Sequence, residues 1–270
     1  MAGRAQALGG LTMAALDLAQ YALGGGAGAL VGFTLGLVGG GGSILAVPLL
    51  VYVVGVPNPH LAIGTSACAV ALNAGSNLVR HARLGNVKWR CALLFAAAGV
   101  LGAAAGSSVG KLVPGERLLA LFALVMLAAS ILMFRRRHDD GDLKVELDRK
   151  NAPRLAAAGG AAGLVSGFFG IGGGFLVVPG LVAATRMPMM AAIGSSLVAV
   201  TAFGLTTAFN YALSGWVDWL LAGAFVAGGV FGGALGARAG VRLSQRRGAL
   251  NMLFAGLLVV VALAMLAQTL

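Results

Sequence analysis

The sequence is poor in charged residues, and above all in acidic ones. Charged residues make up 10% of the 270 positions, and only 8 are Asp or Glu, whereas soluble domains average about 25% charged residues. A chain that is 59% hydrophobic cannot cover its apolar surface with so few polar groups, which excludes an ordinary soluble domain. Intrinsic disorder is excluded as well, because disordered chains combine low hydrophobicity with high charge.

The chain also lacks the regular patterns of collagen and of β-barrels. It contains 44 glycines, but they do not follow the three-residue period of collagen. Long uninterrupted apolar runs stand where barrel strands would alternate apolar and polar residues. Since only helices and closed barrels satisfy every backbone group in lipid, the sequence predicts an all-α polytopic membrane protein.

Residues that bind metals, cofactors or nucleic acid are scarce. Cys68 and Cys91 both lie in apolar runs and imply no disulfide framework. The 3 histidines and few acidic residues form no cluster with metal-ligand spacing. The net charge of +11 comes from cations in short segments between apolar runs, as in cytoplasmic loops of membrane proteins. We therefore expect no metal, no cofactor and no nucleic-acid partner, but a surrounding lipid bilayer.

The chain contains an internal duplication. Residues around a glycine cluster recur 131 positions later: Gly36, Gly39, Gly41, Gly42, Leu45, Val47 and Pro48 match Gly167, Gly170, Gly172, Gly173, Leu176, Val178 and Pro179. Further on the offset is 130, so that Ala62, Ile63, Gly64, Ser66, Gly85, Val87 and Trp89 match Ala192, Ile193, Gly194, Ser196, Gly215, Val217 and Trp219. Shared Gly and Ala content does not explain matched Pro, Trp and Ile residues, so we interpret the chain as two copies of one unit.

Each copy contains five apolar segments. They span 24–38, 43–55, 59–83, 88–110 and 115–134 in the first copy, and 154–169, 174–186, 189–213, 217–240 and 246–268 in the second. The last three of each copy approach the ~20 residues that cross a bilayer, and the first two are short or broken. We therefore divide the chain into an N-terminal segment (1–23), transmembrane repeat 1 (24–134), a cytoplasmic linker (135–153) and transmembrane repeat 2 (154–270), with 8–10 transmembrane segments in all.

The distribution of cations predicts that the two repeats are inverted. The linker and the loop at 84–88 are flanked by Lys and Arg, which places both in the cytoplasm. The equivalent loop at 214–218 carries no cation, whereas the next connection, 238–247, carries four. Equivalent loops thus fall on opposite sides. Inverted repeats with broken helices are the usual plan of secondary transporters, with the substrate site near the midplane.

The glycine breaks are the first candidate for that site. Backbone N–H groups at Gly41, Gly42 and Ser43, and at Gly172, Gly173 and Gly174, would be free to bind an anion where a helix begins. Such a site needs no charged side chain, which would be expensive in lipid. A purely structural interpretation stays open, in which these glycines allow a sharp turn or close packing. The series Gly102-Gly106-Gly110 and Gly232-Gly236-Gly240 are interpreted only as helix-packing surfaces.

Polar side chains on the long spans extend the candidate site. Thr65 and Ser66 match Ser195 and Ser196, and these hydroxyls either bind the anion or bond back to their own helices. Asn73, Asn77 and His81 share one helix face and would line the path. Arg83 would attract the anion from the cytoplasm, although Arg80 and Arg83 would equally serve as positive-inside anchors. The counterparts of Arg80 and His81 are Asn210 and Tyr211, so the charge does not recur.

The order of these motifs resembles the sulfite exporter TauE/SafE family. The resemblance rests on 36–48, 64–66 and 81–89 in the first copy and on 167–179, 194–196 and 211–219 in the second, and it covers about residues 24–268. It implies a multi-pass transporter of the bacterial inner membrane for sulfite or small organosulfonate anions. We thus expect an exporter that works by alternating access and is not an enzyme.

Other functions remain open at this point. One is a carrier or channel for a different small anion, such as a carboxylate. A remote one is a membrane-embedded enzyme that pairs Ser43 or Ser66 with His81, although no Gly-x-Ser-x-Gly elbow is present. A structural or assembly role is the last.

Overall fold

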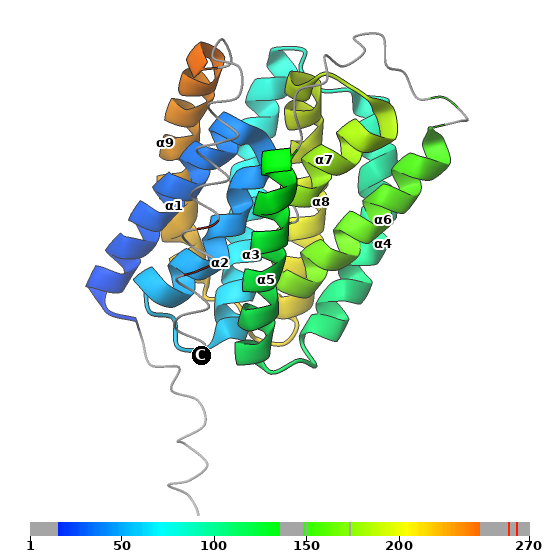
Figure 1. The fold of residues 1–270 in the computed structure, drawn as a ribbon. Coiled ribbons are helices and arrows are strands. Elements are labelled where there is room, and N and C mark those ends of the chain that lie inside the picture. Colours follow the sequence, from blue (N-terminus) through cyan, green and yellow to red (C-terminus); the bar gives the residue numbers. More distant parts are fainter. Residues whose placement is uncertain are drawn as a thin grey trace, which may run out of the picture.

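The structure is a computed structural model that describes residues 16–135, 148, 151–172, 174–243, 259 and 263. The described residues form helices and no strand (Figure 1), which confirms the all-α class. In chain order the elements are α1 (Leu18–Val38), the 3₁₀ segment η1 (Gly39–Leu45), α2 (Ala46–Pro48), the π-helical segment η2 (Leu49–Val53), α3 (Pro59–Arg83), α4 (Trp89–Gly110), α5 (Gly115–Arg135), α6 (Ala152–Phe169), α7 (Gly174–Thr185), α8 (Met189–Ala212) and α9 (Trp219–Leu243).

Five of the described helices are long and apolar enough to cross a membrane, namely Leu18–Leu37, Pro59–Arg83, Trp89–Gly110, Met189–Ala212 and Trp219–Ala239. Their lengths of 20 to 25 residues match the span of a bilayer core. The predicted segments between 43 and 240 coincide with observed elements to within a few residues. The tenth predicted segment, 246–268, lies outside the described residues apart from 259 and 263, and so does most of the linker.

Proline and glycine set the ends of the long helices. Asn58 accepts a hydrogen bond from the N–H of His60, and Pro59 starts α3, as expected of an N-cap followed by proline. At the other end Gly85 has a φ of +71°, and Gly215 after α8 has a φ of +72°. Glycine reaches this left-handed conformation without steric penalty. The two copies therefore end their long helices in the same way.

Helix α1 begins at Leu18, six residues before the predicted start at 24. Gln20, a polar residue of the predicted N-terminal segment, bonds elsewhere in the fold. Its side-chain amide donates to the carbonyl of Val54 at 2.9 Å, and its Oε1 accepts from the N–H of Asp17. A polar side chain that is satisfied by another part of the chain does not stop a helix.

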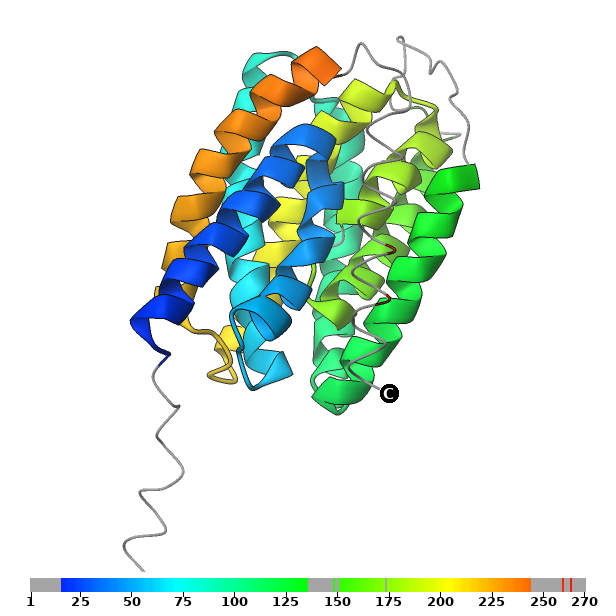
Figure 2. The ribbon, with the colours of Figure 1, turned by 60° about the vertical axis from the view of Figure 1, so that its left-hand side comes forward.

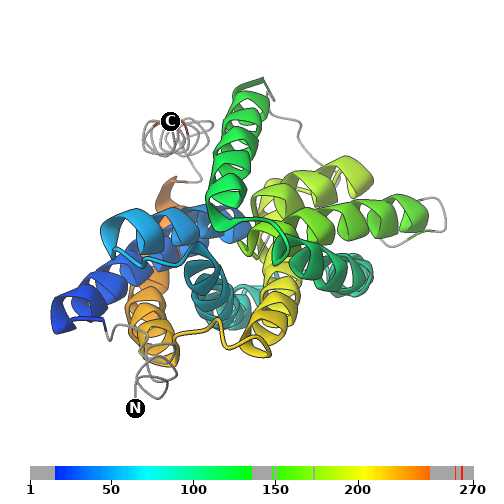
Figure 3. The ribbon, with the colours of Figure 1, turned by 90° about the horizontal axis from the view of Figure 1, so that it is seen from below.

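At both flanks of the bundle, a helix of one copy packs against a helix of the other. The most extensive helix contacts are those of α1 with α9 and of α4 with α6. Helices α1 and α6 occupy equivalent places in the two copies, and so do α4 and α9. Figures 2 and 3 show α1 beside α9 on one side of the molecule and α4 beside α6 on the other. Matched glycines allow this closeness: a Cβ at Gly32 would overlap the carbonyl of Gly229, and one at Gly163 that of Gly99. The predicted series behave alike: a Cβ at Gly102, Gly106 or Gly110 would overlap the backbone of α6, and one at Gly232 or Gly236 that of α1, which confirms these glycines as packing surfaces.

Helices α3 and α8 lie antiparallel between these pairs. The hydroxyl of Thr65 accepts from the N–H of Asp218 at 2.9 Å, and the hydroxyl of Ser195 accepts from the N–H of Lys88 at 2.9 Å. Both contacts join the start of one long helix to the loop that follows the other. The loops 84–88 and 214–218 therefore lie at opposite ends of the bundle. This geometry is what inverted repeats require, whereas the membrane orientation stays a prediction.

Candidate functional site

Two broken hairpins meet at the centre of the bundle. After α1 the chain reverses through η1, and Gly42 packs directly on Thr34 and Leu35. After α6 it reverses at Gly170 and Gly172, whose φ angles are +67° and +65°. Element η1 contacts α7, so the two breaks lie close together as the duplication predicts.

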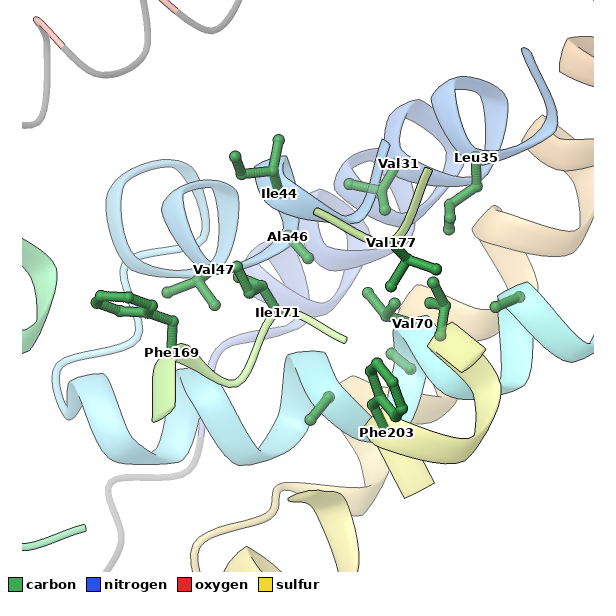
Figure 4. Close-up of a cluster of buried hydrophobic side chains, with 14 of the residues drawn as sticks. Val31, Leu35, Ile44, Ala46, Val47, Val70, Phe169, Ile171, Val177 and Phe203 are labelled. Atoms are coloured by element: carbon green, nitrogen blue, oxygen red, sulfur yellow. The ribbon is translucent and has the colours of Figure 1, made fainter. Parts of the chain in front are cut away.

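Most side chains at this meeting point are apolar, whereas the hydroxyls of Thr34 and Ser66 lie against the carbonyls of Gly42 and Gly170. Figure 4 shows Ile44 and Val47 from the first hairpin near Ile171 and Val177 from the second, and all four are at most 1% exposed. A Cβ at Gly172 would lie 3.1 Å from Val70 on α3 and 3.2 Å from Val200 on α8. We call this set of residues (Ile44, Val47, Val70, Ile171, Val177 and Val200) the apolar layer.

On one side of the apolar layer α3 carries the predicted polar stripe. Asn73, Asn77 and His81 are all buried, and they follow Val70 at successive turns. Both amide atoms of Asn73 and both ring nitrogens of His81 lack a hydrogen-bond partner. The amide of Asn77 donates to the carbonyl of Asn73 at 3.1 Å, and its oxygen accepts from Arg80 at 3.2 Å. Buried polar groups without partners are rare, and each needs an explanation, of which a functional role is one.

The stripe opens into a small cavity at the end of the bundle that bears the loop 84–88. The cavity has a volume of about 30 Å³, room for one or two waters. Its walls come from the end of α1, the end of α3, the start of α8 and α9, through Gly36, Leu37, Arg80, His81, Leu84, Asn86, Met190, Ile193 and Ala237. Of the predicted site residues, His81 lines it. We call it the first mouth.

On the other side of the apolar layer α8 carries the equivalent positions. Thr207 and Tyr211 stand 130 residues after Asn77 and His81, both are fully buried, and neither hydroxyl has a partner. Ser166 on α6 is a third buried hydroxyl without a partner. His60 stacks on Trp216 with ring centroids 4.8 Å apart, and Tyr211 lies against both rings. Aromatic side chains therefore close this end, which we call the second mouth.

The four predicted hydroxyls do not gather in one cage. Thr65 and Ser195 hold the loops at opposite ends of the bundle, as described above. The hydroxyl of Ser66 lies 2.9 Å from the carbonyl of Ile63 and 3.4 Å from that of Gly170, so it joins α3 to the second break. Ser196 bonds back to Ile193 at 2.7 Å. The back-bonding alternative thus describes Ser66 and Ser196 in this structure.

The remaining predicted residues divide between the breaks and the surface. Gly41, Gly42, Ser43, Gly172 and Gly174 are buried at the breaks, and Gly173 lies outside the described residues. Arg83 is exposed, whereas its neighbour Arg80 reaches inward. The ring nitrogens of His81 have no partner, so no Ser–His pair exists at this histidine. The role of all these predicted residues in binding an anion stays a prediction.

Sequence reasoning missed Lys111, at the end of α4. Its ammonium group donates to the carbonyl and the side-chain oxygen of Asn210 at 3.1 and 2.8 Å, and to Ser214 at 3.0 Å. Thr207 could have been found from the 130-residue offset, since Asn77 is its match. Nothing in the sequence marks Lys111, because its neighbours lie about 100 residues away.

Comparison with known proteins agrees with this architecture. The family model for the sulfite exporter TauE/SafE matches residues 25–265. A "Probable membrane transporter protein" of Xylella fastidiosa (strain Temecula1) is 51% identical over 245 residues, covering 88% of this chain and 92% of that protein.

More distant relatives cover most of the chain as well. The "Probable membrane transporter protein" of Haemophilus influenzae is 33% identical and covers 72% of this chain and 74% of its own length. "Probable membrane transporter protein YunE" of Bacillus subtilis is 29% identical, with 77% and 84% covered. No solved structure matches the chain. With apolar spans, a duplicated broken hairpin and a family match over almost its whole length, the chain is a multi-pass membrane protein that belongs to the sulfite exporter TauE/SafE family.

Proposed function

We propose that the protein is a secondary transporter that exports sulfite or a small organosulfonate anion by alternating access. The observation that carries this proposal is the placement of unpartnered buried polar groups on both sides of the apolar layer. Asn73 and His81 lie on the side of the first mouth, and Thr207 and Tyr211 on the side of the second. A substrate would meet polar groups from either end and a dry barrier between them.

The anion class is supported by the charges of the path. The cation that reaches the polar stripe is Arg80, which donates to Asn77 and to the carbonyl of Val230, both neutral acceptors. The predicted path residues include no carboxylate, since the four acidic residues that the structure describes are Asp17, Glu116, Asp148 and Asp218, near helix ends or in loops. Such a path attracts anions and repels cations. The choice of sulfite or organosulfonate within that class comes from the family name.

The mechanism we propose uses the duplication. The two copies make matching contacts, such as those of Thr65 and Ser195, so an exchange of conformations between them would open one mouth while closing the other. In this structure the first mouth contains the cavity and the second is filled by stacked aromatic rings. This structure would thus represent a conformation that is narrowly open toward the end bearing the loop 84–88. The cation distribution places that end in the cytoplasm.

Counterflow in proteoliposomes tests this function. Purified protein is reconstituted in separate vesicle preparations that contain unlabelled sulfite, sulfoacetate, sulfate or acetate, and the uptake of the same anion in radiolabelled form is followed. A carrier accelerates uptake when substrate is present on the far side, whereas a channel does not. Trans-acceleration by sulfur oxyanions is the expected result. Acceleration by acetate alone would assign the carrier to carboxylates, and uptake without acceleration would assign a channel.

A further inference from the structure

Lys111 lies beside the position in the second copy that is equivalent to Arg80. Asn210 is the equivalent of Arg80, and Lys111 donates to two oxygens of Asn210. The equivalent of Lys111 in the second copy is Val241. One cation therefore stands at Arg80 near the first mouth and another lies beside the equivalent Asn210 near the second, and both come from the first copy, on α3 and just after α4.

The surroundings of Lys111 match those of the cavity at the first mouth. Arg80, Leu84 and Ala237 line that cavity. Their equivalents are Asn210, Ser214 and Ser107. Asn210 and Ser214 accept from the Lys111 ammonium group, and the Asn210 amide donates to Ser107 at 2.7 Å. Arg80 itself lines the first mouth, whereas at the second mouth hydrogen-bonding groups at the equivalents of Arg80 and Leu84 hold the cation of Lys111.

The acceptors of Lys111 are all uncharged. They are three neutral oxygens, and no carboxylate among the described residues accepts a hydrogen bond from it. When such a lysine exchanges one neutral acceptor for an anionic oxygen, its hydrogen bond becomes stronger. A charge-assisted hydrogen bond is about twice as strong as a neutral one. Tyr211, the next residue after Asn210, adds a fully buried hydroxyl without a partner.

We propose that Lys111 forms an anion-binding station at the second mouth, so that the transported anion meets one cation at each end of its path. This inference rests on the proposed transport function. It goes beyond that function because it assigns the station to a residue and to a face. A structural role alone would be to cap the last turn of α8, whose carbonyl at Asn210 it contacts.

Face-specific kinetics distinguish the station from the cap. Sulfite exchange is measured in proteoliposomes whose orientation is assigned with an impermeant thiol reagent on Arg90→Cys, an exposed position at the start of α4 that does not line the first mouth. Lys111→Gln is expected to raise the half-saturation concentration of sulfite about tenfold when sulfite is presented at the second mouth, the value of one charge-assisted hydrogen bond. At the first mouth it should stay near the wild-type value. Arg80→Gln should show the reverse, and Lys111→Arg should retain wild-type kinetics.

The second test moves the positive charge from position 111 to position 210. In the double variant Lys111→Gln with Asn210→Arg, the cation returns on α8, at the position equivalent to Arg80. Recovery of the half-saturation concentration at the second mouth would support the station even if Lys111→Gln alone is unstable.

Three results would overturn the proposal in distinguishable ways. If wild-type protein carries none of the anions, both the transport function and the station fail. If wild-type protein carries sulfite and Lys111→Gln has unchanged half-saturation at both mouths, the station fails and the transport function stands. If Lys111→Gln lowers only the unfolding temperature, Lys111 is a helix cap.

Discussion

The hydroxyl of Thr65 accepts a hydrogen bond of 2.9 Å from the backbone N–H of Asp218, 153 residues further along the chain. Ser195 repeats this contact with Lys88 at the same distance. Each bond satisfies an N–H group at the start of a helix, where no carbonyl of the helix itself is available. Because the two bonds lie at opposite ends of the bundle, they fix both loops between the long helices to the opposite copy.

We expect the loss of either hydroxyl to destabilise the fold by about 1–3 kcal/mol, because a buried N–H group is left without a partner. Thr65→Val and Ser195→Ala test this by unfolding in detergent, with Thr65→Ser as a control that keeps the acceptor. The two effects should add, since the sites share no neighbours. Unchanged stability in both variants would mean that water replaces the hydroxyls.

Glycine-to-alanine changes should separate contact glycines from free ones along α1. A Cβ at Gly32 would overlap the carbonyl of Gly229, whereas one at Gly26 would meet nothing within 4 Å. Gly32→Ala is therefore expected to force α1 away from α9 and to lower stability by about 1–3 kcal/mol, as overpacked substitutions do. Gly26→Ala is the matched control and should not reduce the unfolding temperature. Equal tolerance of both would show that α1 and α9 are less closely packed than described.

The sequence predicted the elements well where the signals are local. Pro59 and Gly85 bound α3 at the predicted residues, because each acts on its own backbone. The start of α1 was predicted too late, because Gln20 is satisfied by Val54, a contact that no local pattern reports. The cation at the second mouth was missed for the same kind of reason: the duplication predicted Asn210 at the place of Arg80, but Lys111 comes from another helix.

The candidate site was harder to predict than the fold. The stripe of Asn73, Asn77 and His81 follows from helical periodicity, and the structure places the three residues on one face. The matched positions in the two copies also predicted a shared anion site formed by Thr65, Ser66, Ser195 and Ser196. Yet an antiparallel arrangement of α3 and α8 sends Thr65 and Ser195 to opposite ends. By contrast, the matched residues Val70 and Val200 both lie close to Gly172, in the apolar layer.

Replacement of Gly42 by a bulky residue would not isolate the binding site. A Cβ there would already collide with Thr34 and Leu35, so lost transport would also follow from a displaced hairpin. Asn73 is a cleaner target, because both atoms of its amide are buried without partners. We predict that Asn73→Leu abolishes sulfite exchange while stability is unchanged or higher, since an apolar group replaces an unsatisfied polar one.

Paired measurements of exchange and unfolding temperature check the prediction for Asn73. Ser76→Ala on the same helix serves as the control, because the Ser76 hydroxyl bonds back to the carbonyl of Asn73 and lies off the polar stripe. It should leave exchange intact. A lower unfolding temperature in Asn73→Leu with retained exchange would assign Asn73 to packing and remove it from the path.

Arg80 and Arg83 should differ in how salt affects their loss. Arg80 donates to Asn77 at 3.2 Å and lies partly buried, whereas Arg83 is exposed. An exposed charge acts on an approaching anion through solvent, where about 0.15 M salt limits its range to about 8 Å. Arg83→Gln should therefore slow sulfite exchange at low ionic strength and have little effect at physiological salt. Arg80→Gln should raise the half-saturation concentration at the first mouth about tenfold at both ionic strengths, because a partly buried contact is screened far less.

Sulfite exchange is measured at two salt concentrations, with Arg83→Lys as the charge-preserving control. The result shows for each arginine whether it binds the anion on its path or only anchors the protein in the membrane. If both glutamine variants regain wild-type kinetics in salt, the two arginines act only as surface charges that anchor the loop 84–88. The first mouth would then lack a bound cation, and the apolar layer would be reached through Asn73, Asn77 and His81 alone. A salt-independent defect confined to Arg80→Gln would place the guanidinium group of Arg80 in contact with the anion. The exposed Arg83 would then be left with the role of orienting the protein in the membrane.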